Sequence, residues 1–186
     1  MIQSKQDLKQ YLESDKNALK RNKSHPGHFD YVWRFEIALR KLEYYTNCSK
    51  SGGILHPALL LFFKYNKKKL GVRCGFSIPA NVFEEGLSIA HMGTIVVNEN
   101  ARIGKNCRLH VCTNIGTAAG IEGQAPTIGD NSYIGPGAKI FGPITIGNGI
   151  AIGANAVVNK SFEMNNVSIA GVPAKVISDK GTKDFR

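Results

Sequence analysis

Two of the five histidines, His91 and His110, lie in a glycine-rich part of the chain, nineteen residues apart. An unperturbed imidazole has a pKa of about 6.5 and can accept a proton at neutral pH. Such a base favours attack by an alcohol, which is a poor nucleophile unless its proton leaves during the reaction. The plain alternative for each is a structural histidine. The other three, His25, His28 and His56, are expected to be structural.

The sequence around these histidines repeats every six residues, as in IGPGAKIFGPITIGNGIAIGANAVV at residues 134–158. A helix spaces apolar residues three or four apart and a half-buried strand spaces them two apart, so neither explains the period. One aliphatic residue begins each hexad, glycine often follows it, and a small residue usually comes four places later. The aliphatic positions are Ile103, Leu109, Ile115, Ile128, Ile134, Ile140, Ile146, Ile152 and Val158.

A triangular coil accounts for this period, because each hexad can form one short strand and a corner. The aliphatic residue then points to the axis, coils stack with parallel strands about 4.8 Å apart, and glycine relieves the corner by tolerating positive φ. His91 falls at a corner, and His110, about one coil later, can lie close to it. Since no coil buries its interior alone, residues 77–161 should stack as four or five coils with capped ends.

The chain is predicted to be mainly β, with a small α-helical region at residues 1–70, a β-helix at 71–178 and a tail at 179–186. Apolar residues at helical spacing over 29–45 and an apolar stretch at 54–65 indicate two helices. Pro26 and Gly27 separate them from the loose amphipathic pattern earlier in the chain. The basic run at 64–69 is either a solvated helix end or an anion site.

The composition of the chain limits the kinds of partner that it is expected to bind. The net charge of +10 favours anionic molecules, but no nucleic-acid-reading motif accompanies it, so nucleic acid is not expected. The polar start argues against a signal peptide, and no apolar run approaches the roughly 20 residues of a membrane span. A cytoplasmic location is expected, with peripheral membrane association left open. The four cysteines show no CxxC spacing and are expected to be small buried residues.

These repeats resemble those of the hexapeptide-repeat acyltransferases, whose fold is a left-handed parallel β-helix. Within that superfamily the chain is most similar to the serine acetyltransferase branch and to its capsule and exopolysaccharide O-acetyltransferases. The resemblance rests on LSIAHMGTIVVNENARIG at 87–104, the following NIGTAAG at 114–120 and AGVPAKVI at 170–177. It covers about residues 72–178.

The resemblance implies a homotrimer with active sites in clefts between neighbouring β-helices and with acetyl-CoA as the acyl donor. A histidine of one subunit removes the proton of the acceptor hydroxyl, which attacks the thioester carbonyl directly. His91 matches that histidine and is the predicted general base. His110 is a candidate second contact to the acceptor.

Three departures from the serine acetyltransferase pattern concern the acceptor. The aspartate that orients the base is replaced by Phe76, so Glu84, Glu85 or a backbone carbonyl would have to hold His91. The aspartate before the histidine is Ala90, and an Arg-His-Pro element reads Gln-Ala-Pro at 124–126. A zwitterionic amino acid needs charged partners for both ends. A sugar, nucleotide sugar or glycan is therefore the expected acceptor, in polysaccharide biosynthesis.

The resemblance also implies a path for the cofactor along the later coils. Its matching positions are Gly116, Gly135, Pro136, Gly153, Ala154, Asn159, Lys160 and Lys175. The lysines suit the phosphates of coenzyme A but are equally expected as solvated cations. Between Ile115 and Ile128 the rhythm is interrupted, which predicts a loop expelled from the coil that lines the binding face or is merely tolerated.

Two alternatives stay open. One is a serine O-acetyltransferase of cysteine biosynthesis. The other is a non-enzymatic or metal-binding β-helix. Binding of zinc by such a β-helix would require three imidazoles at a subunit interface. Only His91 and His110 lie within the repeats, so no metal is expected.

Overall fold

The computed structural model describes residues 1–49 and 53–183. Its first part is helical, with α1 (Lys5–Ala18), α2 (Tyr31–Asn47), the 3-10 helix η1 (Gly53–Leu55) and α3 (His56–Cys74). Ser4 caps α1 by accepting from the Asp7 amide, and Asp30 caps α2 by accepting from Trp33. Gly75 ends α3 with φ of 82°, in the left-handed region that glycine adopts at helix ends. The predicted helices are thus present, and α3 continues past the apolar stretch and the basic run to Cys74.

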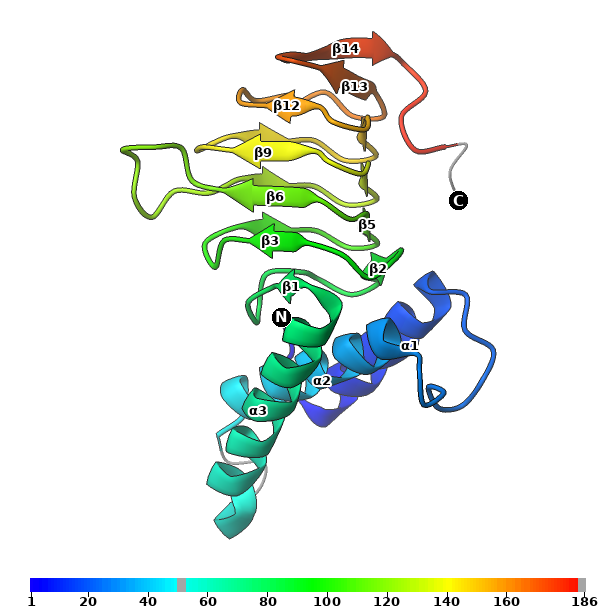
Figure 1. The fold of residues 1–186 in the computed structure, drawn as a ribbon, viewed down its shortest axis with the longest axis vertical. Helices are drawn as coiled ribbons and strands as arrows, with labels where there is room; N and C mark the ends of the chain where they lie inside the picture. Colours follow the sequence, from blue (N-terminus) through cyan, green and yellow to red (C-terminus); the bar gives the residue numbers. More distant parts are fainter. Residues whose placement is uncertain (50–52, 184–186) are drawn as a thin grey trace.

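The second part is a stack of triangular coils (Figure 1). One sheet contains β1 (Phe76–Ser77), β3 (Ile95–Val97), β6 (Thr113–Gly116), β9 (Lys139–Phe141) and β12 (Val157–Val158). The second contains β4 (Arg102–Ile103), β7 (Thr127–Ile128) and β10 (Thr145–Ile146). The third contains β2 (Ser88–Ile89), β5 (Arg108–Leu109), β8 (Tyr133–Ile134), β11 (Ala151–Ile152), β13 (Ser168–Gly171) and β14 (Ala174–Ser178). This confirms the predicted left-handed β-helix of mainly β class.

The interior follows the hexads. All nine aliphatic residues that begin a hexad are no more than 2% exposed. The small residues four places later are also buried, namely Cys107, Thr113, Ser132, Ala138 and Ala156. Parallel pairing joins equivalent places of successive coils, such as Ile134 with Ile152 and Ile128 with Ile146. Because every strand is short, this column of branched side chains holds the coils together through burial of apolar surface.

The corner glycines serve a different purpose from the predicted one. Gly135 and Gly153, which follow hexad starts, do not have positive φ. A Cβ on Gly135 would lie 2.7 Å from the Ile152 carbonyl oxygen, so the next coil passes too close for any side chain. Positive φ instead occurs three places after the start, at Asn106, Cys112, Asn131, Gly137, Gly149 and Asn155. Asparagine and glycine tolerate this conformation best.

Cys112 therefore turns outward at a corner. It is exposed, whereas Cys74 and Cys107 are buried and Cys48 is half-buried. The expectation of four buried cysteines is wrong for Cys112, because its place in the hexad is the left-handed corner and not the interior.

The helices close one end of the β-helix through a buried ionic cluster. The Arg40 side chain of α2 is 0% exposed and binds Asp15 of α1 at 2.7 Å and Glu43 at 3.0 Å. It also donates to the carbonyl oxygens of Phe83 and Glu84 in the first coil, at 2.7 Å each. The apolar cores of α2 and α3 are continuous with that of the β-helix. At the other end, β13 and β14 form an antiparallel hairpin over the last coil.

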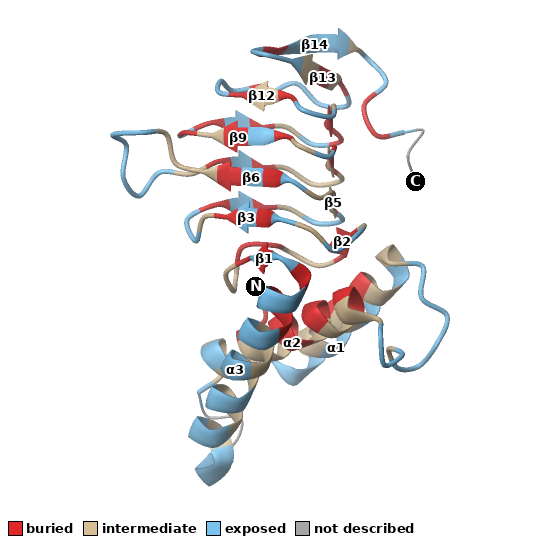
Figure 2. Cartoon of the chain, viewed as in Figure 1, coloured by how far each residue is buried: buried red, intermediate tan, exposed pale blue. Residues whose placement is uncertain are grey.

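Most of α3 points into solvent and away from the coils (Figure 2). Lys64, Lys68 and Lys69 are exposed there, which agrees with the solvated alternative for the basic run. Lys67 is the exception, because its ammonium group lies 5.9 Å from the ring centroid of Phe35 and burial lowers its pKa.

Candidate active site

Strand β2, which precedes His91, is held from below by the carboxyl groups of two helix residues. The Ser88 and Ala90 amides donate to the next coil, but β2 is the first strand of its sheet, so no strand beneath it receives the Ile89 amide. Glu36 of α2 accepts from the Ile89 amide at 3.0 Å. Asp15 of α1 accepts from Gly86 at 2.8 Å and Leu87 at 2.9 Å. Buried amides need such partners, so α1 and α2 fix the strand from which His91 extends.

The structure brings the two repeat histidines together. His91 is exposed at the corner after β2, and His110 is half-buried at the end of β5. Their ring centroids are 6.4 Å apart, and His110 lies 5.0 Å from the ring of Tyr133 on the following coil. The register explains this, because Ile89 pairs with Leu109 and Leu109 with Ile134. A small substrate can touch both imidazoles at once.

His110 has an unsatisfied nitrogen. Its Nε2 atom is buried and makes no hydrogen bond to any described residue. Burial lowers the pKa of His110, and the charges of Arg108 and His91 lower it further. The neutral imidazole is thereby favoured, and its Nε2 atom can form a hydrogen bond with a bound hydroxyl group.

Glu84 and Glu85 do not hold His91. Glu84 binds the terminal ammonium at 2.8 Å and the Tyr11 hydroxyl, and Glu85 binds Lys105 at 2.9 Å and Gln10. Phe76 is buried against Phe35, with ring centroids 5.1 Å apart. Among the described residues no side chain forms a hydrogen bond with His91. Its place is set by the backbone of β2.

The predicted cofactor positions fall into two groups on two different corners. Gly135 and Pro136 after β8, and Gly153 and Ala154 after β11, stack on the corner that carries His91. Lys175 pairs with Ala170 above the same edge. Gly116 at the end of β6, and Asn159 and Lys160 after β12, lie instead at the corner where the next sheet ends. One chain therefore does not bring Gly116, Asn159 or Lys160 beside His91.

The interrupted hexad forms a loop at residues 117–126, between β6 and β7, that extends outward from the stack (Figure 1). The strand register shows the insertion as a longer spacing between paired residues. Ile115 is farther along the chain from its partner Ile140 than Ile140 is from its partner Val158. The loop leaves from the corner of Gly116, not from that of His91.

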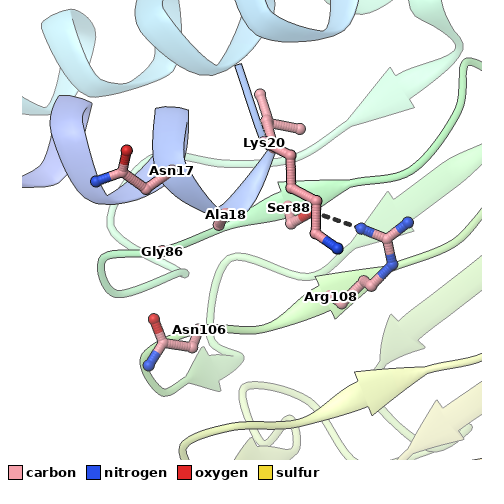
Figure 3. A pocket seen from close by; sticks show the side chains of 8 residues that line it. Asn17, Ala18, Lys20, Gly86, Ser88, Asn106 and Arg108 are labelled. Atoms are coloured by element: carbon pink, nitrogen blue, oxygen red, sulfur yellow. Dashed lines mark hydrogen bonds between the residues drawn. The ribbon is translucent and has the colours of Figure 1, made fainter. Parts of the chain in front are cut away.

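A pocket of about 490 Å³ opens beside β5 where α1 ends (Figure 3). It is lined by Asn17, Ala18, Leu19, Lys20, Gly86, Ser88, Asn106 and Arg108. Arg108 donates to the Ser88 hydroxyl at 3.0 Å. The sequence did not single out this pocket, because it arises where a helix end meets the first two coils. One signal was present, since Arg108 and His110 are two residues apart and so share the outer face of β5.

Among residues 1–49 and 53–183, no three His, Cys, Asp or Glu side chains gather in a way that could hold a metal ion. No helix in that part of the chain has the length and apolarity to span a bilayer.

Comparison with known proteins gives two kinds of relationship. The family "Bacterial transferase hexapeptide (six repeats)" matches residues 125–160. Serine acetyltransferase of Mycobacterium tuberculosis is 38% identical over 100 residues, covering 53% of this chain and 43% of that protein. Serine acetyltransferase of Bacillus pumilus is 33% identical over 106 residues, covering 56% of this chain and 48% of that protein. The chain thus spans less than half the length of these curated relatives.

Solved structures resemble a larger part of the chain. Serine acetyltransferase of Brucella abortus in complex with coenzyme A has a TM-score of 0.72 at 26% identity, covering 95% of this chain and 70% of that one. Soybean serine acetyltransferase complexed with serine has a TM-score of 0.69 at 22% identity, covering 92% and 70%, which speaks for the fold alone. The chain is similar to hexapeptide-repeat acyltransferases of the serine acetyltransferase type, as its sequence predicted.

Proposed function

We propose that this serine acetyltransferase-like hexapeptide-repeat protein is an O-acetyltransferase that uses acetyl-CoA. The observation that carries the proposal is the pair of imidazoles, 6.4 Å apart at one corner of the solenoid, with the glycines of later coils stacked above them. Relatives named serine acetyltransferase, one of them in complex with coenzyme A, support the donor and the reaction class.

In the proposed reaction His91 is the general base. It accepts the proton of the acceptor hydroxyl while the oxygen attacks the thioester carbonyl of acetyl-CoA. The new C–O bond replaces the C–S bond, and the thiolate of coenzyme A leaves and takes up a proton. His110, through its unpartnered Nε2 atom, would hold the same hydroxyl group in place. Neither step requires an acyl-enzyme.

The two separate corners support a homotrimer. The proposed cofactor path includes residues on two corners of the coil. One corner carries Gly135, Pro136, Gly153, Ala154 and Lys175, and the other carries Gly116, Asn159 and Lys160. A neighbouring subunit related by a threefold axis would place its own second corner against the corner of His91. The acetyl-CoA path would then lie between two subunits, in the cytoplasm where this donor is used.

Two acceptors are in competition. Serine is favoured by the names of the relatives. A sugar, nucleotide sugar or glycan is favoured by the residues of the site, because Phe76 is buried in apolar contacts and Ala90 carries no charge. Gln124 and Ala125 are likewise uncharged, where the serine acetyltransferase pattern has arginine and histidine. A zwitterion left without partners for both charges would be bound poorly. We therefore propose a sugar hydroxyl as the acceptor and serine as the second candidate.

A thiol-release assay tests this function. Purified protein with acetyl-CoA is offered L-serine, neutral monosaccharides, uronic acids and nucleotide sugars. We expect release of coenzyme A with a sugar acceptor, and a loss of about 10²- to 10⁴-fold in kcat/KM for His91→Ala. A matched control is His56→Ala, which changes a histidine of α3 outside the repeats. Turnover with serine alone would contradict the sugar acceptor, and full activity of His91→Ala would contradict the function.

A further inference from the structure

The pocket between α1 and β5 carries positive charge without a counterion. Lys20 and Arg108 line it, and no described residue forms an ion pair with either of them. None of the eight lining residues is acidic. Glu85, next to Gly86 in the chain, is already bound to Lys105 at 2.9 Å. Asp15, below Gly86, is bound to Arg40 at 2.7 Å. The pocket is therefore cationic as well as concave.

The pocket also adjoins the two imidazoles. Arg108 begins β5 and His110 directly follows it. Two residues of extended chain span about 7 Å and place alternate side chains on the same side. Ser88 and Ala90 occupy the equivalent places one coil below. A ligand anchored at Arg108 can therefore present another of its groups to His110 and His91.

The end of α1 does not cancel this charge. Helix C-termini expose carbonyl oxygens that repel anions, but three carbonyls near the end of α1 are already engaged, among them that of the lining residue Asn17. The carbonyls of Asp15, Lys16 and Asn17 accept from the amides of Leu19, Arg21 and Lys20. Lys20 itself has φ of 55° and lies just beyond the helix.

The guanidinium of Arg108 keeps free donors. One of its nitrogens donates to Ser88 at 3.0 Å, which fixes the side chain over β2 (Figure 3). Arginine has five N–H donors in a planar fork that suits carboxylate and phosphate oxygens. The side-chain amides of Asn17 and Asn106 add polar groups to the pocket wall. Its volume of about 490 Å³ is within the range of sites for small molecules.

We propose that this pocket binds an anionic group of the acceptor, a carboxylate or a phosphate, whose sugar hydroxyl is then presented to His91 and His110. This inference rests on the proposed function and specifies its substrate class: a uronic acid, or a sugar carrying a phosphate or nucleotide diphosphate. Free serine fits less well, because no carboxylate lines the pocket to pair with its ammonium group.

Steady-state kinetics of three pocket variants and two control variants test the proposal. Lys20→Gln and Arg108→Gln should each raise the KM of an anionic acceptor by about tenfold or more, as loss of a hydrogen bond to a charged group does. The KM of acetyl-CoA should stay the same. Arg108→Lys keeps the charge and should recover part of the loss. The matched controls, Arg102→Gln on another sheet and Lys183→Gln, should leave both KM values unchanged.

The acceptors distinguish the source of the anion. Glucuronate tests a carboxylate, glucose 1-phosphate a phosphate and a UDP-sugar a diphosphate, with glucose as the neutral comparison. Equal kcat/KM for glucose and for all three anions would overturn the proposal. So would a rise in the KM of acetyl-CoA for Arg108→Gln with no change for the acceptor, because the pocket would then belong to the phosphates of coenzyme A.

Direct binding separates this proposal from the function itself. Saturation-transfer NMR with glucuronate and glucose 1-phosphate should show binding of at least one of them to the wild-type protein and to His91→Ala, and not to the Lys20→Gln/Arg108→Gln double variant. Binding of this kind without any acetyl transfer would support the pocket and contradict the transferase function. Absence of binding of either anion to the folded wild-type protein would contradict the pocket.

Discussion

At the scale of single residues, His110 is where the electrostatics of the site can be measured. Burial is the first cause of its lowered pKa, and the neighbouring charge of Arg108 is the second. Arg108→Gln should therefore raise the pKa of His110, because one cation that opposes protonation is removed. NMR titration of the His110 ring resonances would measure the change. Arg102→Gln, on a different sheet, should leave the pKa of His110 where it is.

An unchanged pKa of His110 in the Arg108 variant would mean that the two side chains do not share one face. The same titration tests the geometry of the pocket in another way. Binding of glucuronate or glucose 1-phosphate at Arg108 should raise the pKa of His110, since an anion nearby favours the imidazolium.

The sequence indicated part of this site and missed the rest for a physical reason. His91 and His110 could be predicted as neighbours because both lie within the repeat, whose length sets their separation along the stack. Lys20 lies outside the repeat, in the turn after a helix, so its approach to Arg108 depends on how α1 packs on the first coil. Glu84 and Glu85 were plausible partners of His91 by proximity in sequence, but α1 and the N-terminus take them.

At the scale of elements, Glu36 links α2 to β2, the strand that precedes His91. Burial and the nearby Asp15 raise the pKa of Glu36 well above its usual value, while its bond from Ile89 and the charge of Arg40 oppose that shift. The native state thus holds this proton more tightly than the unfolded chain, and the contribution of Glu36 to stability falls as the pH rises above about 4.5.

Glu36→Gln should remove this penalty while keeping an acceptor for the Ile89 amide. The gain in unfolding free energy relative to wild type should be near zero at pH 4. It should grow by about 1.4 kcal/mol per pH unit until the native pKa is passed. Urea unfolding of both proteins at several pH values measures it, with the exposed Glu99→Gln as the control. A difference that does not depend on pH would show that Glu36 is ionised in the native state.

Arg40 is the central connection between the helices and the coils. Arg40→Met would leave Asp15 and Glu43 buried without their cation, and Phe83 and Glu84 without a donor. Breaking a buried pair in this way costs about 3–5 kcal/mol. Urea denaturation should show that loss, and hydrogen exchange should show faster opening at the Gly86 and Leu87 amides. Lys68→Met, an exposed change on α3, should alter neither quantity.

The six-residue repeat made the solenoid predictable, whereas the way in which the helices close its end was not predictable from the sequence. Every hexad start between Ile103 and Val158 is buried as expected, because a period of six leaves no other common direction for these side chains. The reason for glycine at the corner was wrong, since close approach of the next coil requires it and not positive φ. The residues that cap the end of the β-helix, Asp15, Glu36 and Arg40, do not follow the six-residue repeat. Their role is therefore seen only in how the helices pack on the first coil.

At the scale of the whole molecule, the two separated corners predict that one chain is insufficient. A trimer of the 20.3 kDa chain is expected in solution, and light scattering after gel filtration would measure its mass. A monomer that nevertheless transfers acetyl groups would show that Gly116, Asn159 and Lys160 are not part of the cofactor path.

Subunit mixing tests the same idea within the active enzyme. His91→Ala removes the proposed base from one corner, and Asn159→Trp obstructs the other corner, so trimers of either variant alone should be inactive. When both chains are unfolded and refolded together in equal amounts, about one quarter of the interfaces should join an intact His91 corner to an intact Asn159 corner. Thiol release should therefore recover to about a quarter of the wild-type rate, whereas trimers mixed without refolding should stay inactive. If the base and the cofactor path instead belonged to one chain, no interface in the refolded mixture could contain both, and activity would not return.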